Sequence, residues 1–141
     1  MQSNTVRLFT PREASALLPA LRPLLAALAD RHAERGQLEE LLIEVEQDAK
    51  DGGSTRDCVE LDARLDANLV ELKQLFEALA RHGVEVKDPA IGLIDFYAQR
   101  GAELVYLCYK LGEPEVAHWH PLDDGYRGRK LLESEPEMLK V

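Results

Sequence analysis

Apolar residues recur in steps of three and four along the first half of the chain, and this spacing predicts two long amphipathic helices. The first stripe comprises Leu17, Leu21, Leu24, Leu28, Leu38, Leu42, Val45 and Ala49. The second comprises Leu61, Leu65, Asn68, Leu72, Leu75 and Leu79. The glycine pair of the sequence KDGGST separates the two stripes and predicts a loop. We therefore expect an antiparallel helical hairpin over residues 11–82.

Local signals mark both ends of this hairpin. Thr10 and Glu13 have the spacing of a capping box, and Pro11 fits the first helical position. Gly83 predicts the end of the second helix, because glycine readily adopts the left-handed conformation that terminates helices.

The first helix is longer than the second. Pairing about the loop leaves residues 11–24 without a helical neighbour, so their leucines need another cover. Pro19 and Pro23 lie in this segment, and each removes a backbone donor. The sequence leaves open whether they bend the helix.

The last third of the chain predicts a meander of antiparallel strands, because short segments rich in β-branched and aromatic residues alternate with turn sequences. The segment 104–110 carries apolar residues on both faces and indicates a central strand. The fold class is therefore α+β, with a long antiparallel helical hairpin and a small antiparallel sheet that covers the overhanging helix. We expect a single domain over residues 1–141, with the hairpin at about 11–82, the meander and a C-terminal motif at about 84–130, and an acidic tail at 131–141.

Composition and charge narrow the function classes. The 141 residues are 45% hydrophobic and 30% charged, as is ordinary for one globular domain. The net charge of -9 disfavours a nucleic-acid backbone or an anionic membrane as partner. The start of the chain lacks the pattern of a signal peptide, so we expect a cytoplasmic protein. Cys58 and Cys108 form no CxxC pair and are expected to be buried thiols.

The sequence AHWHPLDDGYRGR at residues 117–129 concentrates the candidate chemistry. His118 and His120 lie two apart on a predicted strand, so both point to one face. Together they could bind a transition-metal ion, with Asp123 or Asp124 as an oxygen ligand. The alternative is a histidine at a strand end that hydrogen-bonds a carbonyl group or a carboxylate.

Other polar residues allow acid–base or anion chemistry. Asp95 is an acid within an apolar strand, where burial would raise its pKa unless a cation pairs with it. His120 could carry a proton near neutral pH. Arg127 and Arg129, with glycines between and beside them, could bind a carboxylate or phosphate, or could pair with acids in a simple turn. No Walker or dinucleotide motif is present, and we expect no cofactor.

The segments LFTPREASALLP, GVEVKDPAIGLIDFYA and VYLCYKLGEPEVAHWHPLDDGYRGR, in this order, resemble the bacterial domain of unknown function 2203 family. The pattern W-H-x-L-D-x-G-aromatic-x-G-R of that family matches Trp119, His120, Leu122, Asp123, Gly125, Tyr126, Gly128 and Arg129. His118 lies outside the pattern, which disfavours a mechanism that needs both histidines. The resemblance implies a fold and a compact C-terminal motif; no activity is established for the family.

Two function classes follow from these features. The first, which we favour, is a non-enzymatic interaction or oligomerisation module that forms a homodimer or binds an unknown protein through its helices. Its basis is extra apolar width beside the stripes, at Leu18, Leu25, Leu41 and Leu69. The second is a small enzyme or ligand-binding protein, with or without a metal, that uses Asp95, His120, Asp123, Arg127 and Arg129.

Overall fold

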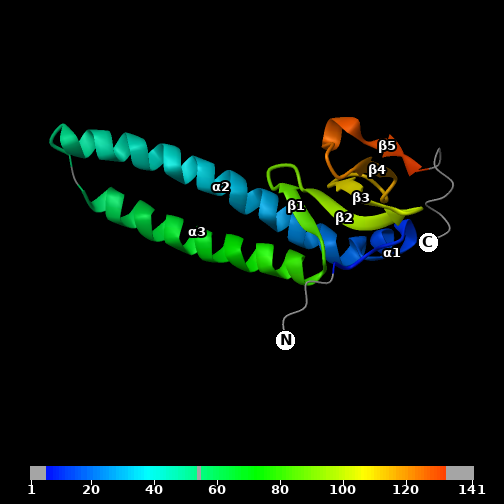
Figure 1. The fold of residues 1–141 in the computed structure, drawn as a ribbon. Coiled ribbons are helices and arrows are strands. Elements are labelled where there is room, and N and C mark those ends of the chain that lie inside the picture. The colour runs from blue at the N-terminus through cyan, green and yellow to red at the C-terminus, as the bar shows by residue number, and fades with distance from the viewer. Residues whose placement is uncertain (1–5, 54, 133–141) are drawn as a thin grey trace.

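A helical hairpin extends from one end of a small antiparallel sheet (Figure 1). The computed structural model describes residues 6–53 and 55–132. The helices are α1 (Pro11–Ala16), α2 (Leu18–Lys50) and α3 (Arg56–Arg81). The strands are β1 (Glu85–Asp88), β2 (Leu93–Arg100), β3 (Glu103–Lys110), β4 (His118–Pro121) and β5 (Lys130–Leu131), and the 3-10 helix η1 (Tyr126–Gly128) precedes β5. The predicted α+β fold class is confirmed.

The first helix begins where its capping box predicts. The Thr10 hydroxyl accepts a hydrogen bond from the backbone N–H of Glu13 at 3.1 Å, and the Glu13 carboxylate accepts one from the Thr10 N–H at 2.9 Å. At the other end of the hairpin, Gly83 has a φ of +86° and follows the last helical turn, as expected for a glycine stop.

The first helix of the predicted hairpin is interrupted at Leu17, which separates α1 from α2. Pro19 accounts for the interruption, because it has no N–H for the carbonyl of Ser15 and its ring crowds that carbonyl. Leu17 keeps helical dihedral angles of -81° and -14°, so the break is local. Pro23 lies inside α2 without ending it.

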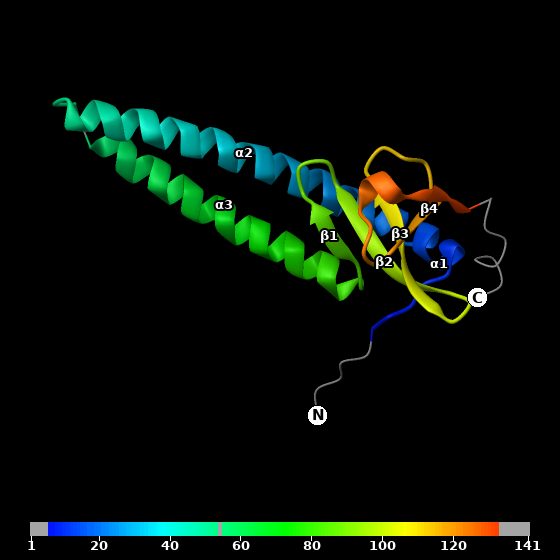
Figure 2. The ribbon, with the colours of Figure 1, turned by 45° about the horizontal axis from the view of Figure 1, so that its top comes forward.

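The helices α2 and α3 lie side by side in Figures 1 and 2 and contact each other. Along this part of the hairpin, the predicted stripes contribute the buried residues Leu38 of α2 and Leu61, Leu72 and Leu79 of α3. A polar layer interrupts the apolar contact. The buried amide of Asn68 donates hydrogen bonds to the Arg31 carbonyl and the Glu34 carboxylate, both at 2.9 Å. Arg31 also pairs with Glu71 of α3 at 3.5 Å. These contacts fix the alignment of the two helices.

One part of the predicted apolar surface of the hairpin is not exposed. Leu18 and Leu25 are only 1% and 0% exposed, and they share the main core with Phe96 of the sheet. The expectation that these two leucines contact a partner is therefore wrong, because the sheet already covers them. Leu41 and Leu69 remain exposed, at 43% and 39%.

The sheet has the strand order β1-β2-β3-β4-β5, and every neighbouring pair is antiparallel. β3 is central, as its two apolar faces predict. The inner face packs in one core with α1 and α2 and contributes Ile94, Phe96, Ala98, Val105, Leu107, Tyr109 and Trp119. The outer face, which points away from this core, carries polar side chains from β2, β3 and β4.

The fold continues into the segment predicted as an acidic tail. Leu131 belongs to β5, and Leu132 is buried, with its N–H donating to the Ala117 carbonyl at 2.9 Å. The folded part therefore extends at least to residue 132. Residues 133–141 of the predicted tail lie outside the described residues.

Candidate functional site

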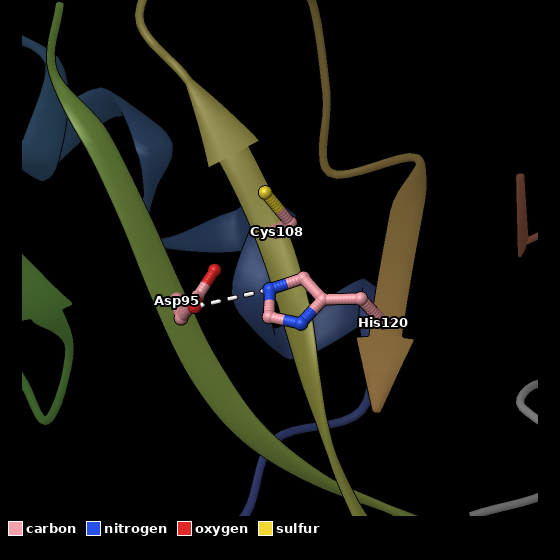
Figure 3. Close-up of side chains that lie close together, drawn as sticks. All are labelled: Asp95, Cys108 and His120. Carbon is pink, nitrogen blue, oxygen red and sulfur yellow. Dashed lines mark hydrogen bonds and ion pairs between the residues drawn. The ribbon is translucent and has the colours of Figure 1, made fainter. Parts of the chain in front are cut away.

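The candidate site lies on the outer face of the sheet. Asp95 of β2 is directly opposite Cys108 of β3, and His120 of β4 is opposite Tyr106 of β3. Figure 3 shows Asp95, Cys108 and His120 projecting from three neighbouring strands toward a common point. Their exposed fractions are only 2%, 1% and 2%. Three chemically reactive side chains are therefore gathered in a region shielded from water.

His120 makes a hydrogen bond with each ring nitrogen. Its Nε2 lies 3.1 Å from Asp95 Oδ2, and its Nδ1 lies 2.8 Å from the carbonyl oxygen of Pro121. A carbonyl oxygen only accepts, so Nδ1 carries a proton. A second proton lies between Nε2 and Oδ2, because an unprotonated nitrogen and a carboxylate would repel each other. The Asp95–His120 pair is therefore neutral overall.

The Asp95 carboxyl group is electrostatically unusual. Burial raises its pKa above the ordinary value, and the attraction and hydrogen bond of His120 oppose this rise only in part. Its second oxygen, Oδ1, is buried without a hydrogen-bond partner among the described residues. A buried acceptor without a partner costs free energy, so this oxygen is suited to receive a ligand.

The thiol of Cys108 is not an activated nucleophile. Burial and the negative charge of Asp95 raise its pKa to about 12, although Arg129 acts in the opposite direction. Both nitrogens of His120 already have other partners, so the histidine does not act as a base for the thiol. This arrangement differs from the Cys–His pairs of nucleophilic enzymes, where the histidine activates the sulfur.

Arg129, a predicted ligand-binding residue, lies beside this group but is occupied by an ion pair. Its guanidinium contacts both oxygens of Glu113, one of them at 3.1 Å. Burial would raise the pKa of Glu113, but the hydrogen bonds from Arg129 hold it below its ordinary value. His118 Nδ1 lies 4.0 Å from the same carboxylate. Burial and the neighbouring Arg129 charge lower the pKa of His118, so its ring is neutral at pH 7.

The structure thus brings together Asp95 and His120 from the predicted ligand-binding residues. Asp123 is exposed on the turn that follows β4, and Arg127 is exposed in η1. His118 shares a strand face with His120, as predicted from the spacing, but it contacts Glu113 instead of meeting His120. Cys108 was not among the predicted site residues. The alternating pattern of residues 104–110 predicts on which face of the strand Cys108 lies, but it does not predict which residues of the neighbouring strands lie beside it.

A small cavity of about 110 Å³ adjoins the buried group. Its lining residues are Lys87, Leu93, Asp95, Tyr106, Cys108, His120, Leu122, Asp124, Gly125 and Tyr126. Pockets for drug-sized ligands are usually about 300–1,000 Å³. This cavity therefore suits a water molecule or an ion better than a metabolite.

A second polar network closes the β1 side of the cavity. The Tyr106 hydroxyl lies 3.0 Å from the Glu85 carboxylate and 3.1 Å from the Tyr97 hydroxyl. Lys87 pairs with Glu85 at 2.8 Å and lies over the Tyr106 ring. These contacts hold Tyr106 and Lys87 in place as walls of the cavity.

Comparisons with known proteins give a family and no activity. Among the described residues, no helix combines the length and the apolar character that crossing a membrane requires. Neither the comparison with curated proteins nor that with solved structures finds a match. A family model described as an uncharacterized conserved protein, DUF2203, matches residues 7–132, which include both helices of the hairpin and all five strands. The chain therefore belongs to the DUF2203 family of uncharacterised conserved proteins.

Proposed function

We propose that this chain is a non-enzymatic oligomerisation module in which a second copy of the chain packs on the α2–α3 hairpin. The main support is a groove of about 540 Å³ between the two helices, near the base of the hairpin. Its lining residues are Leu24, Ala27, Asp30, Arg31, Glu71, Gln74, Leu75 and Ala78. The alanines leave room for an approaching helix, and the leucines offer it apolar surface.

Further apolar side chains along the hairpin support helix-mediated association. Those at least 43% exposed are Leu41, Ile43, Val59 and Val70. Single exposed apolar residues are common, but a long two-helix hairpin that carries several has surface available for more helix contacts. A two-fold homodimer is the simplest assembly that uses one such groove on each copy.

The distribution of charge favours one relative orientation of the two copies. Residues 39–66, which form the outer part of the hairpin, contain ten Asp or Glu and three Lys or Arg. Two such acidic ends would repel each other if they lay side by side. An antiparallel dimer, with the grooves in contact and the hairpin ends pointing apart, avoids this repulsion.

Ala78→Glu tests the groove. The substitution places a charged, bulky side chain in the proposed contact, so we expect a wild-type dimer of twice 15.8 kDa to become a monomer. Leu69→Glu is the matched control, because it introduces the same side chain on the same helix. The two positions are nine residues apart, which places them on opposite sides of α3 at 3.6 residues per turn. Sedimentation equilibrium gives the masses, and circular dichroism verifies that both variants fold.

A wild-type protein that stays monomeric at high micromolar concentration would contradict the proposal. Loss of the dimer in Leu69→Glu, with Ala78→Glu still dimeric, would contradict the assignment of the groove.

The second candidate function is a small enzyme or ligand-binding protein centred on the outer face of the sheet. The buried Asp95–His120 pair beside a cavity favours it. Asp123 and Arg127 would then act from the exposed turn and from η1, and Arg129 would have to leave Glu113. The small size of the cavity makes this candidate weaker than the first for any organic ligand.

A further inference from the structure

We propose that Asp95, Cys108 and His120 form a binding site for a divalent transition-metal ion with the ligand preferences of Zn²⁺. One donor atom from each residue lies within 4.8 Å of the other two. Ligand atoms around a tetrahedral zinc ion are about 3.5 Å apart, given bond lengths of about 2.0–2.3 Å. Small side-chain rotations would therefore bring the three atoms to bonding distance. The site is separate from the hairpin groove and does not depend on the proposed dimer.

The surroundings of His120 and Asp95 suit metal ligands. The Nδ1–H of His120 donates to the Pro121 carbonyl, which fixes the ring and leaves Nε2 as the nitrogen directed at the cluster. Metal-binding histidines usually have their other nitrogen held in this way. Asp95 Oδ1 is buried without a partner among the described residues, so it offers a ready oxygen ligand.

The charge balance favours a divalent ion. Without metal, the group is neutral and holds one proton between Asp95 and His120 and one on the Cys108 thiol. A divalent ion would displace both protons and bind a carboxylate, a thiolate and a neutral imidazole. The site would again be neutral, which burial strongly favours. Binding therefore releases two protons, one from the Asp95–His120 pair and one from the Cys108 thiol.

The donor types favour zinc over magnesium or calcium. A thiolate sulfur and an imidazole nitrogen suit zinc and related transition metals, whereas magnesium and calcium prefer oxygen ligands. Three protein ligands leave a fourth position for a tetrahedral ion. The adjacent cavity of about 110 Å³ has room for a water molecule there.

Titration of the untagged, metal-free full chain with Zn²⁺ and Co²⁺ tests this site. We expect one ion per chain, a cobalt–thiolate charge-transfer absorption band, and release of two protons per Zn²⁺ at pH 8. Cys108→Ser should weaken zinc binding by at least about 100-fold, since a ligand contributes no less than the supporting residues around a metal. Cys58→Ser, which changes the other cysteine in the chain, should leave binding unchanged.

Two histidine variants distinguish this ligand set from one that uses both His118 and His120. His120→Gln should abolish stoichiometric binding, and His118→Gln should preserve it. The absence of stoichiometric zinc binding by the wild type would overturn the proposal. So would binding that survives Cys108→Ser and is lost in His118→Gln or Asp123→Asn. The cobalt spectrum and proton count use the wild type, so they remain decisive even if one variant fails to fold.

Discussion

Replacing His120 by alanine is expected to lower the free energy of unfolding by about 3–5 kcal/mol at pH 7 in the presence of a chelator. The variant leaves Asp95 in a site where the side chain is 2% exposed and its hydrogen-bonded partner is gone. Chemical denaturation measures the loss. His118→Ala on the same strand is the control and should cost less, because its side chain is 22% exposed and its contact with Glu113 is long.

The loss of stability caused by His120→Ala should become smaller as the pH falls. Burial raises the pKa of Asp95 in the folded protein above the ordinary value of 3.8, so the folded state binds its proton more tightly than the unfolded state. The cost of burying Asp95 is therefore absent below the unfolded pKa and grows as the pH rises through the folded pKa. Without His120 the folded pKa rises further. The deficit of the variant should be smallest near pH 4 and largest at neutral pH.

A variant that keeps the wild-type stability at pH 7 would show that the Asp95–His120 pair does not hold the sheet together. The role of His120 would then lie in binding alone, and the metal titration would become the deciding experiment. A deficit that grows as the pH falls would contradict the assignment of the Asp95 charge as its cause.

Leu25→Ala is expected to destabilise the protein by about 2–5 kcal/mol, the range for leucines truncated in a packed core. Leu25 is 0% exposed and belongs to the core between α2 and the sheet. Leu41→Ala makes the same chemical change on the same helix, but Leu41 is 43% exposed and lies beyond this core. Its expected effect is within about 0.5 kcal/mol, and urea denaturation measures both.

Equal effects in the two leucine variants would contradict the position of the sheet over the base of α2. The contrast is informative because the sequence pattern does not distinguish the two residues. Both are leucines beside the same stripe, and only the packing of the sheet separates them.

The hairpin was predictable because its information is local. Steps of three and four fix which side of each helix is apolar, and the capping box at Thr10 and the glycine stop at Gly83 fix two ends. The interruption at Leu17 was not predictable, because a proline in a long helix either bends it or breaks it according to the surrounding packing. The alternation of residues in β3 likewise gave its two faces and its central place.

The candidate site was only partly predictable, because it depends on contacts between distant strands. The spacing of His118 and His120 fixed their common face, and the lone acid in an apolar strand drew attention to Asp95. Their meeting with Cys108 depends on the register between β2, β3 and β4, which no local pattern specifies. The pairing of Arg129 with Glu113 is equally non-local and removed an arginine from the predicted anion site.

The central claim, a homodimer through the hairpin groove, is tested most directly by a distance measured between spin labels on the native Cys58 of the two copies. Cys58 is near the outer end of α3, whereas Cys108 is 1% exposed and stays unlabelled. Sixteen residues of α3 separate Cys58 from the groove residue Gln74, which corresponds to about 24 Å of helix and about 50 Å between the two labels of an antiparallel dimer. Pulsed electron–electron double resonance should give this long distance, and the dipolar signal should be absent in Cys58→Ser. A distance of about 20 Å or less, or no dipolar coupling beyond that of isolated monomers, would contradict the account.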